Sequence, residues 1–333
     1  MVHQLQEGYV FHTFGSTRFL QHVVASVATL RRWDDHRPVA LFAPAHHREA
    51  LVRSGLDSMF DVLEDLPEPH QSVVGFKHNL HRFMPFARNL YVDCDMVWCR
   101  DPGPLWRQFA AYPFTATGVE RSDFYFGGPK GLGVIIDYLL DRRRGTMRHF
   151  GLTYLPRVQA GVIYAQDRET TRQVCEAATG FLNRRAETHF RSRLKEGRTE
   201  ETCEWGLAMA MSSLGLSIVP WLQGHRSPQL DYVEGLTEFS DGFHDVKCRY
   251  YTDRLVYFMR GFPSRRMRDL LIRAFSRLPG RGDYIIVTPF VLHFGWLRYK
   301  DIFERFAERV WLEQAHPEYE YADGDGVAVS VAI

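Results

Sequence analysis

Hydrophobic residues in the first hundred positions follow two alternating patterns. Short apolar runs typical of strands occupy residues 9–14, 38–43, 60–63 and 90–92. Stretches with the three-to-four-residue spacing of a helix occupy residues 19–33, 46–54 and about 76–86. Because strands that alternate with helices form βαβ units, this half of the chain predicts an α/β fold with a mostly parallel central sheet flanked by helices.

The second half of the chain is less regular. Further strands are expected at residues 114–118, 159–164, 216–219, 284–287 and 291–296. Helices are expected at about 201–214 and 264–278, and loops dominate between residues 223 and 245. Neither an internal repeat nor a low-complexity linker marks a domain boundary, so we expect one domain over residues 1–317 and a loosely attached tail over residues 318–333.

Charge is balanced over the whole chain. The 41 basic and 40 acidic residues leave a formal net charge of +1, which gives no global reason to expect nucleic acid or an anionic membrane as a partner. Arginines are clustered at residues 142–144, 184–185, 191–198 and 265–266. Because acidic residues are interspersed with them, we interpret these clusters as solvated helix faces, with recognition of an anionic acceptor as the alternative.

The expected cellular compartment is inferred from the lack of a secretory signal and of a membrane span in the sequence. The first residues carry neither the basic nor the apolar segment of a secretory signal, and no stretch approaches the ~20 apolar residues of a membrane span. The five cysteines are odd in number and scattered along the chain. We therefore expect a protein without a transmembrane segment in the reducing cytoplasm.

Two carboxylates follow the apolar run at residues 90–92. Asp93 and Asp95 are two residues apart at the expected end of a buried strand, so their side chains should lean to the same side. Open α/β sheets bind ligands at the carboxyl ends of their strands. Two carboxylates this close repel each other unless a metal ion or a shared proton relieves them. The pair predicts a cation site; the alternative is one solvated and one turn-capping aspartate.

This pair belongs to an ordered series of motifs along the chain. The series consists of Lys77, the block from Arg88 to Val97, Asp101 with Leu105-Trp106, Ala160-Gly161-Val162 and His293-Phe294-Gly295. In this order the motifs resemble family 8 of the metal-dependent GT-A glycosyltransferases, which includes glycogenin and bacterial lipooligosaccharide galactosyltransferases. The resemblance covers most of residues 9–300 and implies a GT-A fold, with a donor-binding half at about 9–118 and an acceptor half at about 119–317.

The resemblance also implies an activity. Family 8 enzymes transfer a hexose from a nucleoside diphosphate sugar with retention of anomeric configuration, so a UDP-hexose is the expected donor. The acceptor stays open among a glycan, a lipid-linked glycan, a small molecule and a peptide.

A metal site is part of the same implication. The family adds a histidine to the two aspartates, and His293, after an apolar run, matches it. An imidazole among oxygen ligands favours Mn²⁺, with Mg²⁺ as the alternative. Basic residues that match the family's contacts to the donor sugar and diphosphate are Lys77, Arg298 and Lys300. The alternatives are a half-buried structural histidine and basic residues that are only solvated.

Four further residues are candidates for donor binding or catalysis. Thr13 ends the first strand, where the resembled fold holds the base and ribose. Gln159 keeps an amide where the family has asparagine, and Gly161 lets the backbone approach the donor sugar or relieves packing within a strand. Glu204 shares a predicted helix face with apolar residues such as Leu207. An inward carboxylate there can meet a sugar hydroxyl or an oxocarbenium-like centre. The alternatives are a carboxylate at the helix start, favoured by the helix dipole, and a structural ion pair.

Two other classes of function remain open. A haloacid-dehalogenase-type phosphatase would use Asp93 as nucleophile and Asp95 as acid or base, but that family places the motif at its first strand, and here some ninety residues precede it. A catalytically silent protein that binds a nucleotide sugar is the second alternative.

Overall fold

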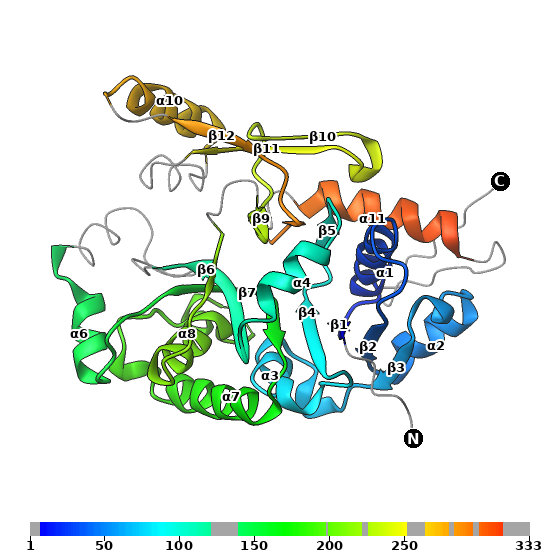
Figure 1. Ribbon diagram of the computed structural model, residues 1–333, viewed down its shortest axis with the longest axis horizontal. Helices are drawn as coiled ribbons and strands as arrows, with labels where there is room; N and C mark the ends of the chain where they lie inside the picture. Colours follow the sequence, from blue (N-terminus) through cyan, green and yellow to red (C-terminus); the bar gives the residue numbers. More distant parts are fainter. Residues whose placement is uncertain are drawn as a thin grey trace.

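A seven-stranded sheet forms the centre of the computed structural model, which describes residues 7–120, 139–197, 199–221, 226–251, 264–279, 283–295 and 300–315 (Figure 1). Its strands, in spatial order, are β3 (Val62–Asp65), β2 (Val39–Ala43), β1 (Glu7–His12), β4 (Arg88–Val92), β7 (Arg157–Ala165), β6 (Phe114–Val119) and β8 (Val219–Pro220). The first four strands are parallel, β7 runs antiparallel to both neighbours, and β8 is parallel to β6. The prediction of a mostly parallel α/β sheet is confirmed.

Helices cover both faces of this sheet. One core contains residues of α1 (Arg18–Arg31), α2 (Ala45–Arg53), α4 (Gly103–Phe109) and α11 (Lys300–Gln314). The other contains residues of α3 (Val73–Lys77), α7 (Arg168–Asn183) and α8 (Cys203–Ser213), with α6 (Arg142–His149) beside them. On β1, Tyr9 and Phe11 point into the first core and Val10 into the second. Burial on both faces explains why this strand reads as a continuous apolar run.

The described residues also form two smaller sheets. The first joins β5 (Met96–Trp98), β13 (Val291–His293) and β9 (Gln229–Asp231), and it therefore connects the segment after β4 with the end of the chain. The second joins β10 (Thr237–Phe239), β11 (Val246–Tyr251) and β12 (Tyr284–Val287). Helix α10 (Arg265–Ser276) packs on this second sheet through Ile272 and Tyr251.

The structure corrects several expected elements. The expected helix at 76–86 is wrong: α3 ends at Lys77, and a 3₁₀ turn follows at Leu80–Arg82. The rings of Phe76 and Phe83 stack with centroids 4.5 Å apart, whereas seven residues of a straight helix would separate them by about 10 Å. Helices α7 and α11 were not expected. The region assigned to loops at 223–245 contains β9 and β10, which are too short to show a clear alternation.

Two observations concern the expected compartment. Among the described residues, no helix has both the length and the apolar character needed to cross a membrane. All five cysteines are free thiols. The expected tail at residues 318–333 lies outside the described residues.

Strands β6 and β7 pack closely at Gly118, which predicts how a larger residue there changes the free energy of unfolding. A Cβ added at Gly118 would lie 2.2 Å from the backbone carbonyl oxygen of Arg157, so the strands must move apart to accept one. Gly118→Ala should therefore lower the free energy of unfolding by about 1–3 kcal/mol. Gly180→Ala is the matched control, because this glycine lies inside α7 with no atom within 4 Å of the added Cβ, and it should gain about 0.5–1 kcal/mol. Urea denaturation of both variants measures the difference, and equal effects would contradict the strand register.

Candidate functional site

Asp93 and Asp95 lie on the short connection between β4 and β5 and not within a strand. The backbone N–H of Asp93 donates to the carbonyl of Gly161 on β7 at 2.9 Å. The carbonyl of Asp95 accepts from the N–H of Phe294 at 2.9 Å. The connection is therefore fixed to the central sheet at one end and to the chain after β13 at the other. It lies at the carboxyl end of β4, the edge where the sequence predicts a ligand.

His293 reaches the same place through β13. In the small sheet, His293 is the register partner of Met96 on one side and of Asp231 on the other. One possible ligand atom from each of Asp93, Asp95 and His293 lies within 4.8 Å of the others. This is close to the spacing of ligand atoms around a single ion. The structure thus brings together the three residues predicted to bind a metal.

The imidazole of His293 is oriented by neighbours on both sides. Its Nδ1 lies 2.9 Å from Oδ1 of Asp231, and its Nε2 lies 3.4 Å from Oδ1 of Asp95. Nε2 of Gln159 lies 2.7 Å from both Asp231 Oδ1 and His293 Nδ1. Burial lowers the pKa of His293, but Asp95 and Asp231 more than reverse this and raise it to about 10. A carboxylate on one nitrogen of an imidazole is the usual support of a metal-binding histidine, so the residues present fit a divalent ion.

Each aspartate also contacts a lysine. Nζ of Lys77 lies 2.7 Å from Asp93 Oδ1 and 3.0 Å from Oδ2, and Nζ of Lys300 lies 3.0 Å from Asp95 Oδ2. Burial raises the pKa of Asp95, but Lys300 and His293 outweigh it and hold the pKa well below its usual range. The expected repulsion between the carboxylates is therefore relieved by ammonium groups of the protein itself. The sequence pattern alone predicts only a metal ion or a shared proton as the group that relieves this repulsion.

Glu204 lies on the first turn of α8, and its backbone N–H donates to the side chain of the capping residue Thr202. Oε2 of Glu204 is buried and has no hydrogen-bond partner among the described residues. Burial raises the pKa of this carboxyl to about 7, against the opposing effects of Arg157 and Lys77. Asp231 and His293 also influence this pKa, so Glu204 is within electrostatic reach of the metal-ligand cluster.

The remaining predicted residues are placed in different ways. Thr13 is buried at the carboxyl end of β1, and its hydroxyl lies 2.9 Å from Nδ1 of His47. A Cβ at Gly161 would lie 2.3 Å from the end of the Met96 side chain, so this glycine has a packing reason. Arg298 lies outside the described residues.

Three residues near the cluster were not singled out from the sequence. The hydroxyl of Tyr91 donates to Asp93, and strand alternation from Tyr91 to Asp93 could have suggested this. Asp231 has the same signal as Asp93, a carboxylate inside an apolar run, but in a region assigned to loops. Glu200 accepts from two backbone N–H groups at the start of α3, at 3.2 and 3.0 Å, and so supports the helix that carries Lys77. No sequence signal identifies that long-range contact.

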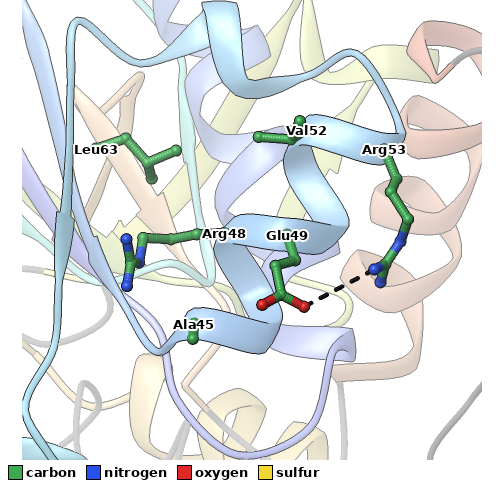
Figure 2. Close-up of a pocket in the computed structure, with 6 residues that line it drawn as sticks. All are labelled: Ala45, Arg48, Glu49, Val52, Arg53 and Leu63. Carbon is green, nitrogen blue, oxygen red and sulfur yellow. Dashed lines mark ion pairs between the residues drawn. The ribbon is translucent and has the colours of Figure 1, made fainter.

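A hollow elsewhere on the surface is formed by α2 and β3. Figure 2 shows the residues that line it, which are Ala45, Arg48, Glu49, Val52, Arg53 and Leu63. Arg48 pairs with Asp65 at 2.8 Å, and Arg53 lies 3.9 Å from Glu49. None of the predicted site residues lines this hollow, so it is separate from the metal-ligand cluster.

Comparison with known proteins gives structural neighbours only. No family model and no curated protein matches the chain. The galactosyltransferase LgtC, in complex with donor and acceptor sugar analogues, is 10% identical with a TM-score of 0.48, over 91% of this chain and 96% of that one. The glycosyltransferase GlyE of Streptococcus pneumoniae is 12% identical with a TM-score of 0.47, over 92% of this chain and 63% of that one. The bifunctional glycosyltransferase WbbM is 12% identical with a TM-score of 0.49, over 94% of this chain and 52% of that one.

These neighbours are glycosyltransferases, the class that the sequence resemblance indicates. With TM-scores below 0.5 and identities near 10%, they assign no role to any residue of this chain.

The raised pKa of Glu204 predicts how the free energy of unfolding changes with pH. The carboxyl has an ordinary pKa of 4.5 and a pKa of about 7 in the fold, so the folded protein holds this proton more tightly than the unfolded chain does. This group therefore lowers stability as pH rises from about 4.5 to about 7, and the cost is fully present above pH 7. Glu204→Gln should gain on the order of 1–3 kcal/mol over the parent near pH 8 and much less near pH 5. Urea denaturation at both pH values checks this, and a pH-independent gain would contradict it.

Proposed function

We propose that this chain is a metal-dependent glycosyltransferase that moves a hexose from a UDP-sugar to an acceptor, with residues 1–317 as one catalytic domain. The donor half is about 9–118 and the acceptor half about 119–317. The observation that carries the proposal is the convergence of Asp93, Asp95 and His293 at the carboxyl end of β4. Two lysines and the half-buried Glu204, with its buried and unpartnered Oε2, accompany them. Transfer from a nucleoside diphosphate needs these groups together, because charge develops on the departing diphosphate.

The donor set suits a divalent cation. Two carboxylates and one imidazole supply ligand atoms, and Asp231 supports His293 from behind so that Nε2 faces Asp95. The imidazole favours Mn²⁺ over Mg²⁺, which remains the alternative. When bound, the ion would stabilise the negative charge that the diphosphate acquires as it leaves.

The two lysines take different roles in this proposal. Lys77 is 4% exposed and contacts both oxygens of Asp93, so it holds that carboxylate in place and offsets charge near the donor. Lys300 is 18% exposed and begins α11. Its ammonium group can leave Asp95 and contact the diphosphate when a cation takes its place. Arg298, two residues earlier, is a second candidate for the diphosphate.

The sugar is assigned to the space beside Glu204. Its unpartnered Oε2 can accept a hydrogen bond from a sugar hydroxyl or face positive charge that develops at the anomeric carbon, and retention is the expected outcome. Thr13 is assigned to the base and ribose, and Gly161 to the close approach of the backbone to the sugar. Gln159 supports His293 and Asp231 in the metal-free form, so its contact with the donor would require this amide to rotate.

The phosphatase alternative is disfavoured by position and by contacts. The aspartates follow β4, after three parallel strands, whereas that class carries them at its first strand. Asp93, the residue required as nucleophile, accepts from both Lys77 and Tyr91. The other alternative, a catalytically silent protein that binds a nucleotide sugar, is distinguished from the proposed enzyme by a measurement of sugar transfer.

The first prediction concerns turnover. With Mn²⁺, the purified chain should hydrolyse at least one UDP-hexose slowly and should transfer the hexose faster to a suitable acceptor. A chelator should abolish both reactions. Asp95→Asn should lower the rate at least about a hundredfold, because the neutral amide is a poorer ligand for the cation. Asp65→Asn is the control, since Asp65 is an exposed carboxylate paired with Arg48. Hydrolysis of p-nitrophenyl phosphate without any release of hexose would contradict the proposal.

The second prediction concerns Lys300. Because its ammonium group and a cation compete for Asp95, Lys300→Gln should strengthen binding of Mn²⁺ alone by several-fold, while weakening binding of UDP in the presence of Mn²⁺ by about tenfold. Isothermal titration calorimetry measures both affinities. Lys247→Gln is the matched control, because Lys247 forms an exposed pair with Asp245 and should change neither value. A Lys300 variant that binds Mn²⁺ and UDP as the parent does would contradict the exchange.

A further inference from the structure

A buried histidine lies behind the metal-ligand cluster. His12 ends β1, is 7% exposed, and shares a face of that strand with Val10, the register partner of Tyr91 on β4. Nδ1 of His12 lies 3.0 Å from the hydroxyl oxygen of Tyr91. The same hydroxyl donates to Asp93, two residues further along the chain. A continuous series of hydrogen bonds therefore leads from His12, in the core, to a proposed metal ligand.

The direction of each hydrogen bond in this series follows from the groups that form it. The carboxylate of Asp93 accepts from the ammonium group of Lys77 and from the hydroxyl of Tyr91. A tyrosine hydroxyl has a single hydrogen, and Tyr91 gives it to Asp93. Its oxygen must therefore accept from His12, which places the imidazole proton on Nδ1.

The surroundings of His12 keep its imidazole neutral. The ring stacks on Phe76 with centroids 4.2 Å apart and on Phe14 with centroids 5.6 Å apart. Burial, and after it Lys77, lower the pKa of His12 to about 3 against the opposing effect of Asp93. A neutral imidazole with its proton on Nδ1 has a bare Nε2, and this buried atom has no hydrogen-bond partner in the described part of the chain.

Packing alone does not account for a histidine at this position. An apolar side chain of similar size would pack against Phe14 and Phe76 without leaving a buried nitrogen unpartnered, which costs free energy. What the histidine supplies and an apolar residue lacks is the N–H that Tyr91 accepts. The hydrogen bond to Tyr91 therefore distinguishes His12 from an apolar residue.

Asp93 is a ligand whose side chain needs support. Its backbone is held by the carbonyl of Gly161, but its side chain is 22% exposed and depends on Lys77 and Tyr91 for its orientation. A carboxylate that is already held in one orientation loses less conformational freedom when it binds a cation.

We propose that His12 is a positioning residue for the metal site and acts through Tyr91. Its Nδ1–H holds the Tyr91 oxygen, so that the hydrogen of this hydroxyl points at Asp93. The inference rests on the proposed function, because it treats Asp93 as a ligand of a cation. It gives Asp93 a buried support that corresponds to the one Asp231 gives His293.

Two substitutions of His12 separate the hydrogen bond from packing. His12→Asn keeps an N–H group near the position of Nδ1, whereas His12→Leu has nearly the same size as His12→Asn and no N–H group in its side chain. Isothermal titration calorimetry of the full chain, with saturating UDP, measures the affinity for Mn²⁺. This affinity should be about tenfold lower in His12→Leu and in Tyr91→Phe, and close to the parent's in His12→Asn.

Tyr164→Phe is the matched control for Tyr91→Phe. Tyr164 is a buried tyrosine of β7 in the same sheet, and its hydroxyl donates to Gln166 at 3.1 Å, so its loss should leave the affinity for Mn²⁺ unchanged. Thermal melting verifies that each variant folds.

Two further measurements distinguish positioning from a general structural role. Adding His12→Leu to Tyr91→Phe should lower the affinity for Mn²⁺ no further, because His12 acts through the hydroxyl that Tyr91→Phe removes. In the metal-free protein, nitrogen-15 NMR should find the imidazole proton of His12 on Nδ1 and none on Nε2. The loss of these signals in His12→Leu identifies them.

The contrary outcomes separate this inference from the proposed function. A parent chain that binds no Mn²⁺ would contradict the proposed function and overturn the inference with it. If the parent binds Mn²⁺, three results would each overturn the inference and leave the proposed function standing. They are an unchanged affinity in His12→Leu, an additive loss in the double variant, and an imidazole proton on Nε2 of His12.

Discussion

The candidate site depends on one backbone pairing, between β5 and β13. This pairing brings residues 96–98 beside residues 291–293, and the hydrogen bond from Phe294 N–H to the Asp95 carbonyl extends it to the aspartates. Without it, His293 would have no fixed relation to Asp93 and Asp95. The parallel pairing of β13 with β9 adds Asp231 on the other side of the imidazole. One three-stranded sheet therefore fixes the positions of both His293, the proposed metal ligand, and Asp231, the carboxylate that orients it.

Charge balance is the second constraint on this site. Buried carboxylates are costly unless they are paired, and here each aspartate has its own lysine while the imidazole lies between Asp95 and Asp231. The fold therefore stands without a metal ion. In the proposed function, the ammonium group of Lys300 becomes available to a diphosphate when a cation replaces it at Asp95, while Lys77 keeps Asp93 in place. Glu204 is the exception, since one of its oxygens has no partner among the described residues and its pKa is raised.

The spacing of hydrophobic residues along the chain predicts the elements whose structure depends on neighbouring residues. The parallel sheet was predictable from the apolar runs of β1, β2 and β4 and from the helical spacing of α1. The candidate metal site was predictable from the two acidic residues after β4. What failed depends on contacts between distant segments. Helix α3 ends at Lys77, and Phe76 stacks on Phe83 where a longer helix is expected. Lys300 meets Asp95 from 205 residues further along the chain. The role of Asp231 depends on a strand of only three residues, which carries too little periodicity to be recognised.

The central claim is that Asp93, Asp95 and His293 hold one divalent cation together with a nucleoside diphosphate. Anomalous diffraction at the manganese edge, from crystals grown with Mn²⁺ and UDP, tests it most directly. The account predicts one strong peak within coordinating distance of all three side chains and of diphosphate oxygens, with the Lys300 ammonium group moved from Asp95 to the phosphate. A diphosphate bound without a manganese peak between these residues, or a peak at other residues, would contradict it.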